Sequence, residues 1–275
     1  MSKPKRSAVG AVAAMVAVAV TAAASADALA AEAQQIENAH YTAVVDPGRG
    51  GLLTKLTSKA TGEVLIDNMR IYTDVGVLAD GRYGYIGTGE GSCEKFAVSR
   101  QGDATVVEAE GRLVGKAAAG KPPLFYRCRT VFDQSATIRV SAAVKPSETK
   151  QVGGFLALSW YMPSMARWAV RTIEGLLRHA IVPGEHKRGR AFSHQWPLDP
   201  DRPLLLFVSR KGAELRIEGL RFSGRPAFTG PVIHGQSVFL CWIDGAPRQL
   251  IAGQWATLEF TLAVGAEDIR DGERG

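Results

Sequence analysis

The feature that most constrains this chain is a succession of short segments, between residues 36 and 264, in which apolar and polar residues alternate. Alternation with a period of two is typical of β-strands that bury one face. Gly, Pro or Asp residues separate the segments, and helical periodicity is almost absent. Short alternating strands at this spacing predict a large antiparallel β-sandwich or a barrel rather than a βαβ protein.

The alternating segments continue without a break in composition, a linker or an internal repeat. One domain over residues 36–265 is therefore the simplest organisation, and a chain of this length can bury a substantial core. The charged, Gly-rich residues 266–275 are expected to form a disordered tail. From Met165 to Leu177 the apolar residues have mixed spacing, so helix and strand both stay open there.

The first thirty residues have the pattern of a secretory signal peptide. A basic start, MSKPKR, precedes an Ala/Val run from Ala8 to Ala24, and small-x-small cleavage sites follow. The alternative is a membrane anchor, but the run is Ala-rich and at the short end of a spanning helix. Residues 1–30 thus predict a secreted or periplasmic protein with no stable membrane insertion after cleavage.

Part of the positive net charge of the chain comes from this predicted signal peptide. The formal net charge is +6, from 33 basic and 27 acidic residues. Cleavage after Ala26 removes Lys3, Lys5 and Arg6, which leaves 30 basic against 27 acidic residues, a net charge of +3. A charge this small gives no reason to predict nucleic acid as a partner.

The cysteines Cys93, Cys128 and Cys241 are few and odd in number, which excludes a disulfide scaffold. At most one pair can form, and the sequence leaves open which one. Cys241 lies within the apolar segment VFLCWI, so we expect a buried free thiol there.

Residues 36–67, IENAHYTAVVDPGRGGLLTKLTSKATGEVLID, contain two turns between three apolar segments. Pro47 presets its φ in the first turn, and the glycines around it supply positive φ where a hairpin needs it. This pattern predicts a β-meander. The segment resembles the first strands of the galactose mutarotase-like supersandwich, which is shared by sugar epimerases, domains of glycoside hydrolases and some polysaccharide lyases. The residues that carry the resemblance are Glu37, Asn38, Tyr41, Gly50, Gly51, Thr61 and Gly62.

The resemblance implies a large antiparallel β-sandwich and a carbohydrate-related role, but a fold does not determine a function. The most unusual composition lies between Arg167 and His194, with six basic residues against two acidic ones. Aromatic faces that pack on sugars, beside cations that bind carboxylate or sulfate, suit an acidic glycan. The alternative is a solvated basic loop with Trp side chains at the sandwich edge. The candidate ligand-binding residues are Trp196, Arg188, Arg190, Trp168, Tyr83 and Tyr85.

Some of these residues occur in short local patterns. His194 alternates with Trp196 in FSHQW, so both can share a strand face, although a structural histidine is an equal alternative. Tyr83 and Tyr85 in GRYGYIG can stack on a sugar or pack at the rim of the core. The segment from Gly84 to Ser92 is Gly-rich but precedes no helix, which predicts a loop beside a cleft rather than a phosphate loop.

Catalysis is less well supported than binding. A polysaccharide lyase needs a cation that neutralises a uronate carboxylate and a base that removes the adjacent proton. The candidates are Arg178, Arg188 or Arg190 with His194 or His179. The acid and base of the mutarotases do not carry over, because Glu259 in WATLEFTL is expected to face solvent, and a glycoside hydrolase would need a carboxyl pair.

The sequence thus predicts an exported protein that binds an oligo- or polysaccharide, with uronate-containing and sulfated glycans as candidates and a polysaccharide lyase as the alternative. Hexose mutarotase and glycoside hydrolase activities are less favoured. No cofactor is predicted. No metal site is predicted either, because the histidines lack a short-spaced ligand motif.

Overall fold

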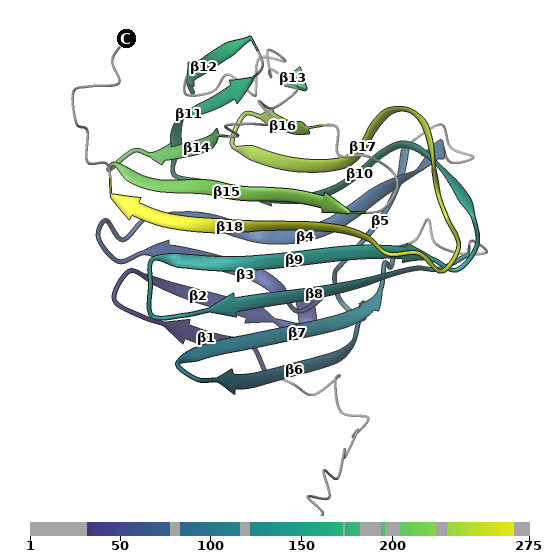
Figure 1. The fold of residues 1–275 in the computed structure, drawn as a ribbon, viewed down its shortest axis with the longest axis horizontal. Coiled ribbons are helices and arrows are strands. Elements are labelled where there is room, and N and C mark those ends of the chain that lie inside the picture. The colour runs from purple at the N-terminus through teal and green to yellow at the C-terminus, as the bar shows by residue number, and fades with distance from the viewer. Residues whose placement is uncertain are drawn as a thin grey trace, which may run out of the picture.

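The computed structural model describes residues 32–77, 83–115, 122–172, 174–181, 194–195, 204–223 and 230–266. Within them the chain forms a series of antiparallel β-strands and one short 3-10 helix, η1 (Pro47–Arg49). The strands build two large sheets that pack face to face (Figure 1). The predicted all-β antiparallel sandwich is confirmed.

Sheet A lies behind sheet B in Figure 1. Its strands are β1 (Gln34–Glu37), β2 (Tyr41–Asp46), β3 (Leu52–Ser58), β4 (Val64–Val77), β5 (Tyr83–Gly87), β10 (Lys150–Tyr161), β13 (His194–Gln195), β16 (Gly230–His234) and β17 (Ser237–Leu250). Their order is β1-β2-β3-β4-β10-β17-β16-β13, and β5 pairs with β4. The meander predicted from residues 36–67 forms β2, β3 and the start of β4.

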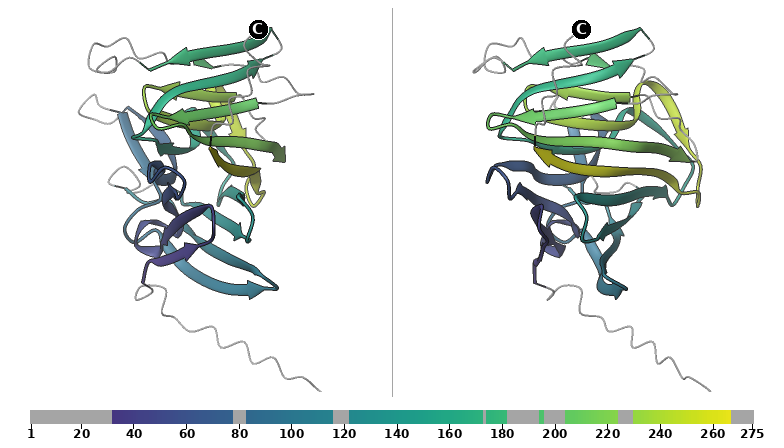
Figure 2. Two further views of the ribbon diagram at one scale, coloured as in Figure 1. Left: turned by 90° about the vertical axis from the view of Figure 1, so that its left-hand side faces the viewer. Right: turned by 60° about the vertical axis from the view of Figure 1, so that its left-hand side comes forward.

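Sheet B faces the viewer in Figure 1. Its strands are β6 (Cys93–Gln101), β7 (Ala104–Arg112), β8 (Leu124–Phe132), β9 (Thr137–Pro146), β11 (Met165–Thr172), β12 (Gly175–Ala180), β14 (Leu204–Ser209), β15 (Ala213–Ser223) and β18 (Ala256–Ala266). Their order is β12-β11-β14-β15-β18-β9-β8-β7-β6. The turned views of Figure 2 show β11 and β12 at one end of the sandwich.

The hydrophobic core lies between the two sheets. On β2, Tyr41, Ala43 and Val45 are buried while the residues between them are partly exposed, as the alternation predicts. On β18, Leu258 and Phe260 are buried in the same way. Side chains from both inner faces form one cluster, so each sheet has an outer face available for other functions.

Asn38 ties the start of sheet A to the turn between β8 and β9. Its Nδ2 group donates hydrogen bonds to the carbonyl oxygens of Asp133 (2.9 Å) and Ser135 (2.8 Å). Its Oδ1 atom accepts from the backbone N–H groups of His40 (2.8 Å) and Tyr41 (3.1 Å). The amide of Asn38 is thereby satisfied although the residue is buried, which explains its place in the opening motif.

The first turn of the meander packs closely against sheet B and the loop after β5. Asp46 caps η1 by accepting a hydrogen bond from the N–H of Gly48, and Gly50 follows with a φ of 90°. A Cβ atom at Gly50 would lie 2.6 Å from Cβ of Thr88, and one at Gly51 would lie 2.4 Å from Cβ of Ala109. Both positions therefore need glycine, because any side chain would push this turn away from its neighbours.

The segment from Met165 to Leu177, for which helix and strand were both open, forms the hairpin of β11 and β12. The three cysteines are buried free thiols, which confirms the prediction for Cys241. Glu259 is exposed on β18, as predicted. The predicted signal peptide, residues 1–30, and residues 267–275 of the predicted tail lie outside the described residues. In the part of the chain that the structure describes, no helix is long and apolar enough to cross a membrane.

Candidate functional site

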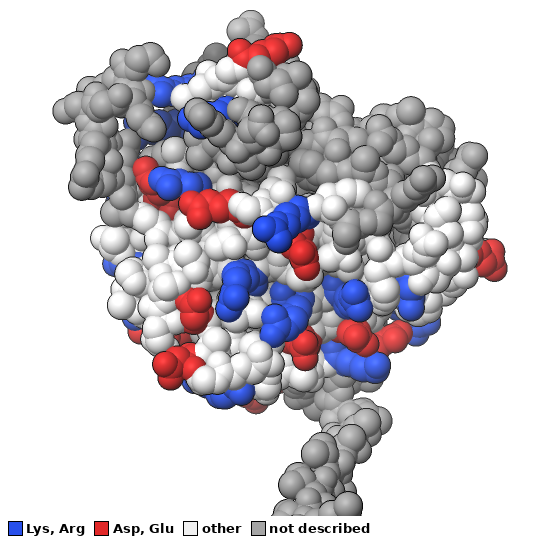
Figure 3. Space-filling model, in the orientation of Figure 1, with Lys and Arg blue, Asp and Glu red and all other residues white. Residues whose placement is uncertain are grey.

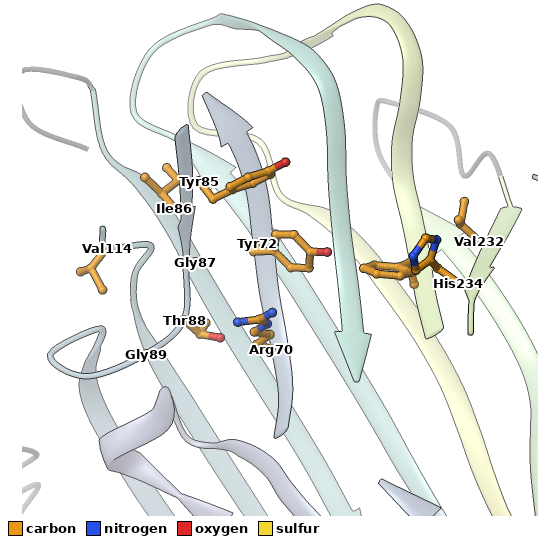
Figure 4. Close-up of a pocket in the computed structure, with 11 residues that line it drawn as sticks. Arg70, Tyr72, Tyr85, Ile86, Gly87, Thr88, Gly89, Val114, Val232 and His234 are labelled. Atoms are coloured by element: carbon orange, nitrogen blue, oxygen red, sulfur yellow. The ribbon is translucent and has the colours of Figure 1, made fainter. Parts of the chain in front are cut away.

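A cleft of about 680 Å³ opens on the outer face of sheet A, the face turned away from the core. Its described side chains include Arg70 and Tyr72 on β4, Tyr85 on β5, His234 on β16 and Phe239 on β17. Figure 4 shows Arg70, Tyr72, Tyr85 and His234 around the cleft, with the loop that follows β5 along one side. We call this surface the cleft face.

Small residues on the central strand explain the hollow. On β10, Leu156, Leu158 and Trp160 point into the core, so Ala157 and Ser159 lie on the outer face. Each faces larger side chains on the neighbouring strands. The register pairs Ala157 with Tyr72, and Ser159 with Arg70 on one side and Phe239 on the other. A strip of small side chains between two larger rows forms a trough.

Tyr72 is the centre of the aromatic side chains in the cleft. Its ring makes edge contacts with Tyr85, at 6.2 Å between centroids, and with Phe239, at 6.0 Å. The guanidinium carbon of Arg70 lies 5.1 Å from its centroid. Opposite Tyr72 on β5 is Gly87, where a Cβ atom would lie 2.8 Å from that of Tyr72. A glycine at residue 87 therefore leaves the room that the tyrosine side chain occupies.

Burial raises the pKa of Tyr72 to about 12, while the nearby Arg70 cation acts in the opposite direction. The phenol is therefore protonated at neutral pH. In that state it can donate a hydrogen bond to a ligand, whereas proton removal from a substrate would require the phenolate.

The loop after β5 is held rigidly against β4. The backbone N–H of Thr88 donates to the carbonyl of Ile71 (2.8 Å), and the Thr88 hydroxyl accepts from the N–H of Ile71 (3.1 Å). Gly87 and Val114 exchange two backbone hydrogen bonds, of 2.9 and 2.8 Å. The segment from Gly84 to Ser92 was predicted to be a loop beside a cleft. Its first part belongs to β5 instead, and the residues from Tyr85 to Gly89 do line the cleft.

The described lining residues of the cleft include two basic side chains, the guanidinium of Arg70 and the exposed imidazole of His234. No Asp or Glu is among those lining residues. Aromatic rings, a phenol, a guanidinium and an imidazole can together stack on a sugar ring and bind its hydroxyl or carboxylate groups.

The outer face of sheet B, which we call the charged face, is different. Figure 3 shows basic and acidic side chains interspersed on it. Neighbouring strands form the ion pairs Lys95–Glu110 (3.1 Å), Arg112–Glu94 (3.0 Å) and Arg129–Glu108 (3.4 Å). The charges in these pairs are balanced within the sheet. Within the described residues, no group of three or more potential metal ligands comes together.

Of the residues predicted from the sequence, Tyr85 lies in the cleft, where its side chain is 54% exposed. Tyr83 begins β5, but its side chain lies outside the described residues. Arg178 is exposed on β12, and His179 beside it packs against Trp168, with 5.4 Å between ring centroids. Trp168 is only 6% exposed and belongs to the core cluster, so its ring does not line the cleft.

On the strand β13, Gln195 pairs with Val232, which lines the cleft, whereas His194 is opposite a residue that is buried in the core cluster. His194 itself pairs with Ile233. Its side chain lies outside the described residues, as do all of Arg188, Arg190 and Trp196. The roles predicted for these residues stay predictions.

Sequence reasoning did not single out Arg70, Tyr72, His234 or Phe239. The available signal was the alternation in MRIYT, where Met69 and Ile71 are buried and the residues between and after them point outward. An outward arginine and tyrosine on one strand indicate a polar face, but nothing in that segment says which other strands lie beside it.

No protein-family model and no curated protein matches the sequence. Solved structures do match. The galactose 1-epimerase from Lactobacillus acidophilus NCFM has a TM-score of 0.55 at 10% identity, with 84% of this chain and 93% of that chain covered. The GalM/aldose epimerase homologue from C. elegans has a TM-score of 0.53 at 10% identity, with 85% and 99% covered. A galactose mutarotase related enzyme from Lactobacillus acidophilus has a TM-score of 0.52 at 11% identity, with 85% and 97% covered. The chain therefore has a galactose mutarotase-like fold.

Proposed function

We propose that this chain is an exported glycan-binding protein that holds its ligand in the trough of the cleft face. The observation that carries the proposal is the grouping of three aromatic rings, Tyr72, Tyr85 and Phe239, with Arg70 over a strip of small residues. The apolar faces of sugar rings stack on such aromatic side chains, and the polar groups orient them. The sugar-related names of the structural neighbours agree with this proposal.

Arg70 favours a ligand that carries a carboxylate or sulfate group. Its guanidinium is exposed, and the structure gives it no carboxylate partner among the described residues. A planar guanidinium can make two parallel hydrogen bonds to a carboxylate. An oligo- or polysaccharide with uronate or sulfate groups therefore fits the cleft better than a neutral one.

Tyr85→Ala tests the proposal. The side chain is exposed, so its truncation should change the melting temperature little, while the loss of a stacking ring should weaken glycan binding about tenfold. Calorimetric titration after a glycan array with neutral, uronate and sulfated oligosaccharides measures both effects. Binding that is unchanged in Tyr85→Ala, or no glycan bound by the parent protein, would contradict the proposal.

A glycan-processing enzyme is the second candidate, because Arg70 and His234 line the same cleft. In a polysaccharide lyase, the arginine would neutralise the uronate carboxylate and the imidazole would take the proton from the adjacent carbon. The C–O bond to the leaving sugar would break as the C=C bond forms, and the leaving oxygen would take a proton from water. An unsaturated uronate product absorbs ultraviolet light, so incubation with acidic polysaccharides tests for it. A change in optical rotation with free aldoses tests for epimerase activity.

Export is the third part of the proposal and is supported by the sequence of residues 1–30. We expect the mature chain to begin between Asp27 and Gln34 and to be found outside the cytoplasm. Mass spectrometry of the N-terminus measures this, and recovery of the intact N-terminus from washed membranes would contradict it.

A further inference from the structure

Tyr161, at the end of β10, continues the cleft face beyond the residues that line the cleft. Ala157, Ser159 and Tyr161 alternate with side chains that are buried in the core, so the three share the outer face. Tyr161 is 42% exposed, and Tyr85 in the cleft is 54% exposed. Two accessible aromatic rings therefore lie on the same face of sheet A, one in the cleft and one beyond it.

The phenol of Tyr161 is fixed by a chain of hydrogen bonds. Its hydroxyl donates to Oε1 of Gln236, at 2.6 Å. The Nε2 group of Gln236 in turn donates to the carbonyls of Pro163 (2.7 Å) and Met165 (3.3 Å), and the backbone N–H of Met162 donates to the Gln236 carbonyl (2.9 Å). The ring is therefore held in place while much of it stays accessible. Such preorganisation reduces the entropy that a ligand contact would otherwise cost.

Polar side chains flank the ring of Tyr161. The register across sheet A pairs Tyr161 with Asp67 on β4 and with Ser237 on β17, and Ser237 pairs with His234. Directly opposite residues in a sheet share a face. Asp67 is therefore on one side of Tyr161, one strand away, and His234 is on the other side, two strands away. Asp67 is exposed, and His234 is already part of the cleft.

The strand β4 changes its course next to this ring. Asn68 has a φ of 56°, and the pairing of β4 with β10 is irregular between Ser159 and Tyr161. A left-handed residue at an irregular pairing is typical of a β-bulge, which reorients the neighbouring side chains and is common next to binding sites.

From these contacts we propose that Tyr161, Asp67 and Gln236 form a distal subsite for a second part of the same ligand. The ligand would then be an oligo- or polysaccharide that lies along β4 and β10, with Tyr161 stacking on a sugar and Asp67 accepting hydrogen bonds from its hydroxyls. Gln236 positions the ring. This inference rests on the proposed glycan binding, and it adds that the ligand is a chain rather than a single sugar.

The length of the site supports a chain. Tyr85 is opposite Asp74 of β4, and Tyr161 is opposite Asp67. Those two positions are seven residues apart in sequence, which at about 3.3 Å per residue, with an allowance for the bulge, gives roughly 20 Å. A single sugar ring cannot reach from one tyrosine to the other.

The test uses sugars of one to six units from galacturonate, mannuronate, sulfated galactan and cellulose series, titrated against the whole protein in the form that the cell produces. The parent protein should gain about tenfold in affinity between the disaccharide and the hexasaccharide of the series that it binds. Tyr161→Ala should remove that gain and leave the shortest ligands unaffected. Tyr85→Ala should weaken binding at every length.

Tyr161→Phe is the matched control, because it keeps the ring and removes only the hydroxyl that contacts Gln236. It should retain most of the gain in affinity with chain length. Its melting temperature shows whether the hydrogen bond between Tyr161 and Gln236 also stabilises the fold. Equal losses at every length in Tyr161→Ala, or no gain with length in the parent, would overturn the distal subsite and leave the glycan proposal standing. Failure of the parent to bind any of the four series would overturn both.

Discussion

The two outer faces of the sandwich contain the same kind of contact in different surroundings. On the cleft face, the guanidinium carbon of Arg70 lies 5.1 Å from the ring centroid of Tyr72. On the charged face, that of Arg127 lies 4.5 Å from the centroid of Trp255, and the amine of Lys145 lies 4.7 Å from the same centroid. A cation over an aromatic ring therefore does not by itself mark a ligand site.

The difference lies in what surrounds each contact. Beside Tyr72, the opposing residues Gly87 and Ala157 are small, so the ring borders open space. On the charged face, acidic and basic side chains of neighbouring strands pair with each other. The cleft face thus leaves room for a ligand, whereas the charged face satisfies much of its charge internally.

The largest effect on glycan binding is expected from removing the aromatic ring of the cation–ring contact on the cleft face, compared with removing the corresponding ring on the charged face. Tyr72→Ala should weaken glycan binding between tenfold and a hundredfold, about 1.4 to 2.8 kcal/mol, because it removes a central aromatic side chain with its hydroxyl. Trp255→Ala should leave binding unchanged, although it removes a larger ring. Titration calorimetry with the best glycan measures both, and thermal unfolding shows that each variant is folded.

Two outcomes would break the comparison. Equal losses of binding in Tyr72→Ala and Trp255→Ala would mean that the cleft is not the site. A loss in Trp255→Ala alone would move the site to the charged face.

The second prediction compares the effects on glycan affinity of removing the arginine from each of these cation–ring contacts. Arg70→Gln should lower the affinity for an acidic glycan about five- to tenfold, or roughly 1 kcal/mol, and leave a neutral glycan nearly unaffected. The loss should shrink as salt is added, because charge attraction at an exposed site is screened within about 8 Å at physiological ionic strength. Arg127→Gln removes the same charge from the other face and is the control. An identical response of the two variants would indicate attraction to the whole protein rather than recognition in the cleft.

Much of the fold could be predicted from the sequence, because strands such as β2 and β18 bury one face against a single core. The segment LLTKLTS alternates and forms β3, and the turn before it has the glycines that its close packing requires. The segment from Met165 to Leu177 could not be assigned, since its part on β11 contains three consecutive buried residues, Trp168, Ala169 and Val170. Burial on both sides of a strand removes the alternation on which such an assignment depends.

The candidate site was much harder to predict than the fold. Its residues come from β4, β5, β16 and β17, and only the register brings Tyr72 near Phe239, 167 positions later in the chain. Local patterns carry no information about which distant strands are neighbours. The density of basic residues between Arg167 and His194 instead predicted a binding site in that segment. The described part of the segment lies at one end of the sandwich, where Arg178 is exposed. Among the predicted site residues whose side chains the structure describes, Tyr85 alone lines the cleft.

Alkaline pH gives the third and smaller effect. Burial raises the pKa of Tyr72 to about 12, whereas an unfolded tyrosine titrates near pH 10. Between these values the unfolded chain binds fewer protons than the folded one, so stability is fully present below pH 10 and is lost as pH rises towards 12. After an allowance for its partial exposure, Tyr72 should account for about 1 kcal/mol of the loss by about pH 11.

Tyr72→Phe has no proton to lose, so its unfolding free energy should fall less steeply above pH 10 than that of the parent. The remaining slope should come from Tyr41 and Tyr126 and from the thiols of Cys93 and Cys128, because burial raises the pKa of each of these groups. Denaturant unfolding at pH 8 and about pH 11 measures the difference. Parallel losses in parent and variant would show that the phenol of Tyr72 is as hydrated as in the unfolded chain.

The smallest effect is expected for an ion pair of the charged face. Arg129 contacts Glu108 at 3.4 Å and donates to the side-chain oxygen of Gln101 at 3.1 Å, and its own side chain is 45% exposed. An exposed pair of this kind contributes about 0 to 1 kcal/mol, so Arg129→Gln should change the unfolding free energy by no more than about 0.5 kcal/mol. Binding of acidic and neutral glycans should not change. Arg70→Gln removes the same charge from the cleft, where the guanidinium lies beside the ring of Tyr72 rather than in an ion pair of the charged face. A loss of acidic-glycan affinity in Arg129→Gln as large as in Arg70→Gln would therefore show that total charge, and not the trough of the cleft face, determines binding.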